Sequence, residues 1–120
     1  MDSSLYARLG GSKGIATIIE DVVANHLNNP VVAPRFVKVA DLGKLKRLAS
    51  EFFCAGSGGA EGYSGRDMRT THSGMNISQQ EYLSVMDDIV QALDKNGIGA
   101  REKGEVIAIL HSLKGDILRV

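Results

Sequence analysis

The chain of 120 residues has one cysteine, two prolines and no tryptophan, and neither sign of charge is in excess. With a single cysteine, Cys54, no internal disulfide can form, which excludes a disulfide-stabilised secreted domain. Lysine plus arginine and aspartate plus glutamate each number 14, so no broad electrostatic field would attract nucleic acid or an anionic membrane. No apolar run approaches the roughly 20 residues that are needed to span a bilayer.

The rest of the composition is typical of a folded domain. Hydrophobic residues account for 43% of the chain and charged residues for 23%, which argues against a disordered protein. The length predicts one domain, residues 1–120, with a single buried core. The N-terminal Met-Asp-Ser-Ser has neither the basic region nor the apolar run of a signal peptide. We therefore expect a cytoplasmic monomer whose partner is small or neutral.

Apolar residues recur at helical spacing in the first half of the chain. A first helix is expected with Ser12 as its N-cap and an end at residues 28–30, Asn-Asn-Pro. A second helix is expected after Asp41, and it should end where glycines begin at Gly56. The expected inner faces are Ile15, Ile18, Ile19, Val22, Val23, His26 and Leu27 in the first helix, and Leu45, Leu48, Ala49, Phe52 and Phe53 in the second.

Two more helices are expected in the second half. Ser78 and Glu81 have the spacing of a capping box, and Asn96-Gly97 is a stop signal. The last helix should begin near Ala100. The expected inner faces are Tyr82, Val85, Met86, Ile89, Val90 and Leu93, and then Val106, Ile107, Leu110, Leu113 and Ile117, with Ile109 near the edge. No segment alternates like a strand, so the fold class is all-α, although periodicity does not distinguish a bundle from a globin.

Several familiar chemistries lack their residue patterns. The three histidines lie far apart, without a His-Glu-x-x-His motif, so no local zinc motif is present. The glycine-rich residues 56–65 follow a helix and have Glu61 where a dinucleotide-binding motif needs its third glycine. We expect an irregular loop there. Cys54 ends an apolar stripe, which favours a quiet core thiol over a nucleophile.

His72 is the candidate for the chemistry of the protein. A haem needs one neutral imidazole for its iron and a wide apolar slot for its ring. Met68 lies four residues before His72 and Ile77 five after it. The opposite wall of such a slot would come from Leu45, Leu48, Phe52 and Phe53. Spacing alone also allows, and favours, a plain polar histidine in a surface turn between Thr71 and Ser73.

Five motifs stand in a characteristic order along nearly the whole chain. They are Leu-Tyr-Ala-Arg-Leu-Gly-Gly at 5–11, the segment from Asn29-Pro30 to Phe36, Phe52-Phe53, Gly58-Gly59, and Tyr-Ser-Gly-Arg-Asp-Met at 63–68 followed by His72. This order resembles the truncated (two-over-two) haemoglobins, specifically their group I. The resemblance implies a two-over-two helical sandwich around haem b, with His72 as the proximal iron ligand.

The resemblance also implies the other haem contacts. Tyr63 is similar to a tyrosine that bonds a haem propionate, and Lys44 and Arg66 are the cations that would add charge-assisted bonds. The residues expected against the porphyrin are Phe36, Leu45, Leu48, Ala49, Phe53, Met68, Thr71, His72, Ile77 and Tyr82. A diatomic gas, such as oxygen, nitric oxide or carbon monoxide, would bind on the iron.

The distal side departs from the family pattern. Counting back from Pro30 places Val22-Val23 where group I usually has Phe-Tyr, so the tyrosine that bonds the gas is missing. Leu45, Leu48 and Ala49 are apolar where the family often has a glutamine. We therefore expect a distal pocket of Val23, Leu45, Leu48 and Ala49 without a hydrogen-bond donor.

The other two histidines receive no ligand role. His26 lies one turn beyond Val23, and we interpret it as a histidine at the edge of the core, with an inward reach as the alternative. Some relatives attach a haem vinyl group to a histidine of the last helix. His111 does not align with that position, and we interpret it as structural.

The leading functional prediction is reversible gas binding for oxygen transport, storage or sensing, with a reductase as a further partner. The alternative is a haem enzyme, either a nitric oxide dioxygenase or a peroxidase-like protein, and both would benefit from the missing distal donor. A cofactor-free interaction module is a third hypothesis. The neutral charge permits it, and the ordered pocket motifs oppose it.

Overall fold

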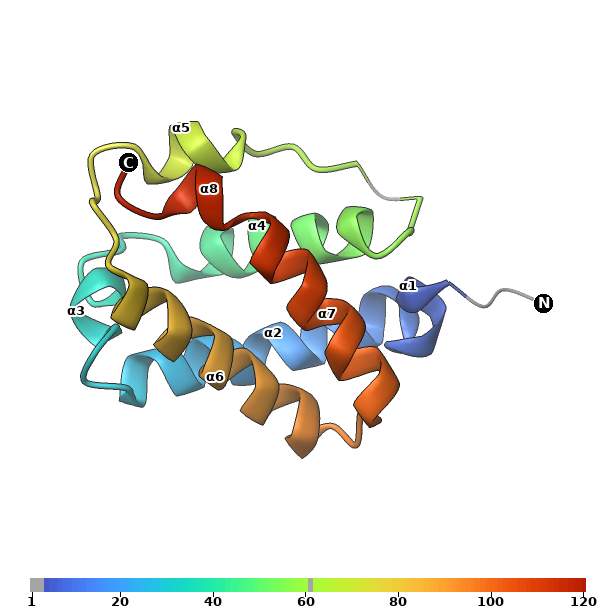
Figure 1. The fold of residues 1–120 in the computed structure, drawn as a ribbon. Helices are drawn as coiled ribbons and strands as arrows, with labels where there is room; N and C mark the ends of the chain where they lie inside the picture. The colour runs from blue at the N-terminus through green and yellow to red at the C-terminus, as the bar shows by residue number, and fades with distance from the viewer. Residues whose placement is uncertain (1–3, 61) are drawn as a thin grey trace.

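The computed structural model describes residues 4–60 and 62–120, and it is all-α (Figure 1). The helices are α1 (Leu5–Arg8), α2 (Gly11–Asn28), α3 (Ala33–Phe36), α4 (Leu42–Gly56), α5 (Met68–His72), α6 (Gln79–Lys95), α7 (Ala100–Ser112) and α8 (Lys114–Ile117). Among these described residues the one β-type contact is an isolated bridge between Ile77 and Leu118. None of the described helices is both long and apolar enough to cross a membrane.

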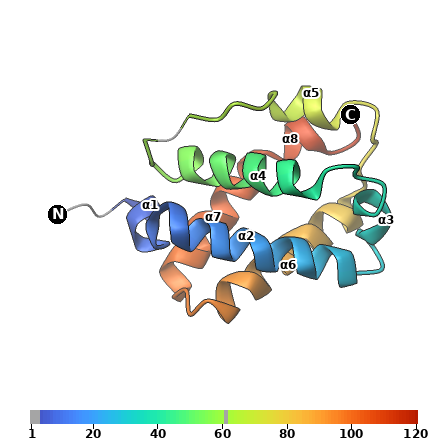
Figure 2. The same ribbon diagram turned by 180° about the vertical axis from the view of Figure 1, so that it is seen from behind.

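The helices form two layers. In Figure 1, α2 and α4 lie behind α6 and α7, and Figure 2 shows the same layers from the other side. Helix α2 packs against both α4 and α6, and α6 also packs against α7. The central cluster of buried residues is Leu5, Leu9, Ile15, Ile18, Ile19, Val22, Val23, Cys54, Ile89, Ala92, Leu93, Val106 and Leu110. This is the expected two-over-two sandwich, with Cys54 buried as predicted.

Two helix starts follow from local side-chain bonds and confirm the sequence prediction. The Asp41 carboxylate accepts the Lys44 amide N–H at 2.9 Å, at the start of α4. At the start of α6, the Ser78 hydroxyl accepts the Glu81 N–H and the Glu81 carboxylate accepts the Ser78 N–H, both at 3.1 Å. Each bond satisfies an amide that the first helical turn leaves without a partner.

The predicted start of α2 is wrong. Gly10, with φ of 97°, is the N-cap, and Ser12 already lies inside the helix, where its N–H donates to the Tyr6 hydroxyl at 3.1 Å. A side chain at Gly14 would lie 2.3 Å from the Leu9 carbonyl oxygen. The turn from α1 into α2 therefore depends on glycine at both positions.

The last predicted helix is also divided. Its chain bends at Leu113, so that α8 is a separate turn. Ile107 was expected to be buried and is 37% exposed, whereas Ile109 packs against the core. Leu27, at the end of α2, is likewise exposed.

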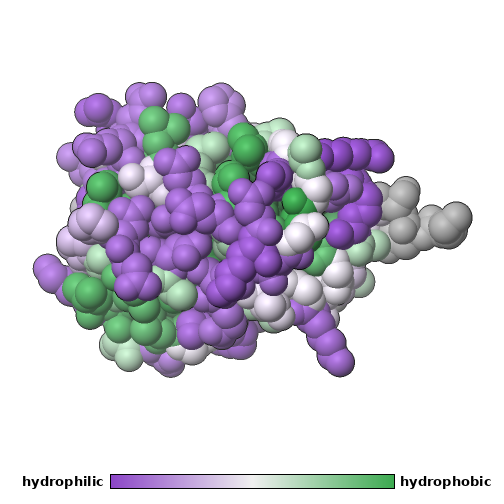
Figure 3. All heavy atoms as spheres, turned by 90° about the horizontal axis from the view of Figure 1, so that it is seen from below, coloured by the Kyte–Doolittle hydropathy of each residue, from purple (hydrophilic) through white to green (hydrophobic). Residues whose placement is uncertain are grey.

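One face of the molecule is mainly polar. Figure 3 shows hydrophilic side chains over most of this face, a hydrophobic group at the lower left and smaller hydrophobic groups among the polar side chains. Among the described residues, the large apolar side chains that are exposed are Leu27, Val37, Leu83 and Ile107.

Candidate functional site

A cavity of about 420 Å³ lies between the two helical layers. Its wall includes residues of α2 to α8, and most of the lining side chains are apolar. Cavities of about 300–1,000 Å³ with apolar walls and a few polar groups are typical of cofactor sites. Among the predicted site residues, those that line it are Val23, Phe36, Leu45, Ala49, Phe53, Thr71, His72, Ile77 and Tyr82.

Five predicted site residues do not line this cavity: Lys44, Leu48, Tyr63, Arg66 and Met68. Lys44 and Arg66 are exposed, and the other three are partly buried. The Tyr63 hydroxyl donates to the Arg66 main-chain oxygen at 2.7 Å. The propionate contacts of Lys44, Tyr63 and Arg66 and the porphyrin contacts of Leu48 and Met68 stay predictions.

His72 ends the short helix α5 and points one ring nitrogen at its own helix. Nδ1 lies 2.8 Å from the main-chain oxygen of Met68, four residues earlier. A carbonyl oxygen only accepts, so Nδ1 carries a hydrogen, and in the neutral ring Nε2 is then the nitrogen with the lone pair. That is the tautomer that a metal-binding histidine needs, and a bond of this kind orients the imidazole. Met68, predicted as a ring contact, thus acts here through its main chain.

Helix α5 is tied to the end of the chain. The Gly74 and Asn76 N–H groups donate to the main-chain oxygen of Val120 at 3.1 and 3.0 Å, and the Arg119 N–H donates to the Ile77 carbonyl at 3.0 Å. Gly74, Asn76 and Arg119 all have positive φ. Helices α5 and α8 lie side by side at this end (Figure 1). The residues that follow His72 are therefore held by the C-terminal segment.

The part of the cavity wall that α2 and α4 supply is apolar at the predicted distal positions. Val23 is buried, and Val23, Leu45 and Ala49 all line the cavity. None of these side chains has a hydrogen-bond donor.

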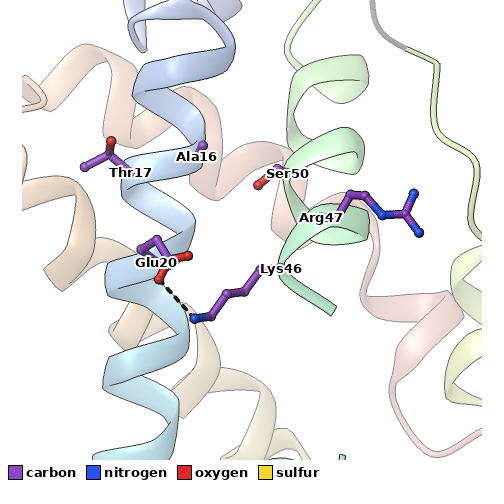
Figure 4. A pocket seen from close by; sticks show the side chains of 6 residues that line it. All are labelled: Ala16, Thr17, Glu20, Lys46, Arg47 and Ser50. Atoms are coloured by element: carbon purple, nitrogen blue, oxygen red, sulfur yellow. Dashed lines mark hydrogen bonds and ion pairs between the residues drawn. The ribbon is translucent and has the colours of Figure 1, made fainter. Parts of the chain in front are cut away.

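A groove of about 310 Å³ lies on the outside, between α2 and α4, and Figure 4 shows its residues. Lys46 crosses this groove, and its Nζ lies 3.0 Å from an oxygen of Glu20. Lys46 is therefore directed away from the cavity, and the cavity wall does not include it.

His26 is the main addition to the predicted site. It is only 5% exposed and lines the cavity, so the alternative of an inward reach describes it better than a place at the core edge. Its Nδ1 lies 2.7 Å from Oδ2 of Asp88 on α6. Burial lowers the pKa of His26, and Asp88 opposes that shift. Sequence reasoning missed Asp88, although it lies between Val85 and Ala92 on the apolar face of its helix.

An ion pair at the cavity edge was also missed. Arg35 on α3 donates from Nε and Nη2 to the two oxygens of Glu81, at 2.7 and 3.1 Å, and both residues line the cavity. Arg35 holds the pKa of Glu81 down at about 2. The pair joins α3 to the start of α6. The capping pattern predicted the helix-start role of Glu81, whereas nothing local indicates its partner 46 residues away.

The family model described as bacterial-like globin matches residues 4–119. The chain belongs to the bacterial-like globin family. The predicted resemblance to the truncated haemoglobins is thereby confirmed. Membership implies that this globin carries a haem.

Curated relatives agree with that assignment. The globin is 25% identical to the group 1 truncated haemoglobin GlbN of Mycolicibacterium paratuberculosis, over 96% of this chain and 84% of that protein. It is also 25% identical to GlbN of Nostoc sp., over 97% and 98% of the two chains.

Solved structures confirm the fold. The truncated haemoglobin of Tetrahymena pyriformis, in its Fe(III) form, superimposes with a TM-score of 0.92 at 20% identity, over 98% of this globin and all of that chain. A Synechococcus 2/2 haemoglobin with covalently attached haem gives a TM-score of 0.87 at 24% identity, over 97% and 98% of the two chains.

The residues of this globin fit a haem. The cavity has a mainly apolar wall, and the His72 tautomer presents an Nε2 lone pair. His111 is exposed on α7 and does not line the cavity. It remains interpreted as structural.

Proposed function

We propose that this globin binds haem b through His72 and reversibly binds a diatomic gas, oxygen in the first place, for transport, storage or sensing. Nitric oxide and carbon monoxide fit the same proposal. The observation that carries it is the His72 imidazole, whose Nδ1 donates to the Met68 main-chain oxygen at 2.8 Å while the ring lines a mainly apolar cavity.

The side chains around the cavity have separate tasks in this proposal. Ferrous haem, when bound, would supply an iron on which the gas binds. Phe36 and Phe53 would provide broad apolar contact for the ring, and Nε2 of His72 would hold the iron. Val23 and Leu45 keep the gas side dry. Because they donate no hydrogen bond, we expect fast release of oxygen.

The test is an optical spectrum of the protein reconstituted with haemin, recorded in the ferric, ferrous and oxygen-exposed forms. We expect a Soret band, a mainly five-coordinate ferrous form and a reversible change with oxygen. A protein that takes up no haem contradicts the proposal and favours the interaction module. A ferrous form that is mainly six-coordinate and low-spin contradicts the open site.

A haem enzyme is the second candidate, and the buried pair of His26 and Asp88 is the observation that favours it. A histidine with a carboxylate partner is a common proton-transfer group. Single-turnover mixing of the oxygenated protein with nitric oxide, and steady-state assays with peroxide, distinguish such turnover from gas binding alone.

A further inference from the structure

Two imidazoles line the same cavity, and each has one ring nitrogen without a hydrogen-bond partner among the described residues. Nδ1 is engaged in both rings, on Met68 for His72 and on Asp88 for His26. Nε2 is therefore available in both. The proposed haem uses only the Nε2 of His72, which leaves that of His26 to be explained.

The other polar side chains on the α3 and α6 side of the cavity are already engaged. The Tyr82 hydroxyl donates to the main-chain oxygen of Leu110, and Arg35 donates from two nitrogens to Glu81. In the adjoining wall from α2 and α4, the residues around His26 are apolar. Its Nε2 is consequently the polar atom that this wall offers to a small ligand.

The hydrogen bonds around Asp88 show which ring nitrogen of His26 carries the hydrogen. The Asn29 side-chain nitrogen donates to both oxygens of Asp88 at 3.2 Å, and its own oxygen accepts the Val31 N–H at 3.0 Å. The second bond orients the amide so that its nitrogen faces Asp88. The carboxylate is thus held as an acceptor, and Nδ1 of His26 is the donor. Nε2 then has a lone pair and acts as an acceptor.

The ring is also held in place and kept neutral. It stacks on Phe36 with ring centroids 4.8 Å apart and an interplanar angle of 18°. It is 5% exposed, and burial disfavours the charged imidazolium, which lowers the pKa of His26 against the opposing effect of Asp88. A neutral ring with its hydrogen on Nδ1 can accept a hydrogen bond at Nε2 but cannot donate one there.

We propose that His26, oriented by Asp88, is a specificity-determining hydrogen-bond acceptor in the gas pocket, and that it favours small ligands with a proton to donate over dioxygen. Hydrogen sulfide and water belong to that ligand class. Dioxygen has no hydrogen to donate. Bound dioxygen also acquires negative charge, which the lone pair on Nε2 of His26 would repel. This inference rests on haem binding by His72.

The test compares haem-reconstituted wild-type protein with His26→Leu. Hydrogen sulfide is the probe for the ferric protein and oxygen release the probe for the ferrous protein. We expect His26→Leu to weaken sulfide binding about two- to tenfold, the equivalent of one hydrogen bond, and to slow oxygen release. Removal of a donor would instead speed oxygen release, so the sign of the change distinguishes an acceptor from a donor.

The double variant His26→Leu/Asp88→Asn is the control for the buried carboxylate that His26→Leu leaves behind, and it should show the same two changes. Faster oxygen release in both variants, or unchanged rates and sulfide affinity, overturns the acceptor role while the proposed haem function stands. If the ferrous wild type is six-coordinate and His26→Leu is five-coordinate, His26 is an iron ligand. That result also overturns the acceptor role. A wild-type protein without a Soret band overturns both proposals.

Discussion

The two imidazoles of the cavity have the same arrangement of protons but are held by different kinds of structure. His72 stands in the five-residue helix α5, and its Nδ1 partner is a main-chain oxygen only four residues earlier. His26 stands in the 18-residue helix α2, and its partner Asp88 is 62 residues away on α6. The first partner is supplied by a single helical turn. The second exists only because α2 and α6 pack in one particular register.

The two regions also differ in how they are stabilised. The His72 side is short, partly exposed and tied down by main-chain bonds from the C-terminal segment. The His26 side is buried within the core, where polar groups are costly if they lose their partners. Substitutions on the His72 side should therefore act mainly on haem retention. Substitutions on the His26 side should act mainly on the stability of the fold and on ligand preference.

The largest expected effect is on haem retention. His72→Ala should lose haem or hold it weakly, because this substitution removes the proposed protein–iron bond. His26→Leu should keep its haem. Transfer of haem to an excess of apomyoglobin, followed optically, measures the difference. His111→Ala, on the exposed face of α7, is the control, and wild-type retention by His72→Ala would show that the iron ligand is misassigned.

Stability should be affected most on the other side. Asp88→Ala leaves Nδ1 of the buried His26 and the side-chain amide of the partly buried Asn29 without their acceptor, and a buried unsatisfied group costs about 1–3 kcal/mol. We expect the free energy of unfolding, measured with urea on the apoprotein, to fall by at least about 1 kcal/mol. Asp87→Ala is the matched control, since Asp87 is the exposed neighbour on α6 and should change stability by less than about 0.5 kcal/mol. Equal losses in the two variants would contradict a special role for the buried pair.

A smaller effect is expected on oxygen release when a donor is added to the apolar distal wall. Val23→Tyr should slow oxygen release several-fold, because one hydrogen bond contributes about 0.5–1.5 kcal/mol, and should change carbon monoxide release little. Stopped-flow measurement of both gases tests this, and the carbon monoxide rate controls for overpacking by the larger side chain. In the His26→Leu background the effect should grow, since the new hydroxyl then has no imidazole to which it can donate. Unchanged oxygen release in both backgrounds would show that residue 23 does not face the gas.

The smallest expected effect is on acid stability. Arg35 lowers the pKa of Glu81 from its usual 4.5 to about 2 in the folded protein, so the stabilisation is complete above pH 4.5 and is lost as the pH falls toward 2. Glu81→Gln keeps the capping box but removes this titration. Its Tm should therefore fall less between pH 4.5 and 2, by about 1–4 °C for a partly exposed pair. Asp87→Asn controls for the change in net charge, and an identical acid dependence in wild type and Glu81→Gln would contradict the role of the pair.

Several features of this globin could be predicted because their causes are local in the chain. The capping groups Asp41 and Ser78 bond to amides three residues away, and α4 and α6 begin where the sequence indicates. The segment from Tyr63 to His72 carries the family resemblance, and it places His72 on the cavity wall. Of the four residues expected in the apolar distal wall, Val23, Leu45 and Ala49 line the cavity and Leu48 does not.

Local patterns also failed at two helix ends. Gly10 is the N-cap of α2 and the Ser12 N–H donates to the Tyr6 hydroxyl, although Ser12 resembles an N-cap in the sequence. The bend at Leu113 divides the last helix, and Ile107 turns outward.

The sequence alone therefore determined the all-α class and the existence of the four long helices, because periodicity and capping depend on residues within a few turns of one another. The resemblance carried by the segment from Tyr63 to His72 singled out His72. Only the tertiary structure decided the pairing of His26 with Asp88, the link from Arg35 to Glu81 and the attachment of α5 to the C-terminal segment. These contacts join residues that are 42 to 62 positions apart in the chain. Their existence depends on how the helices pack, which periodicity and capping patterns do not specify.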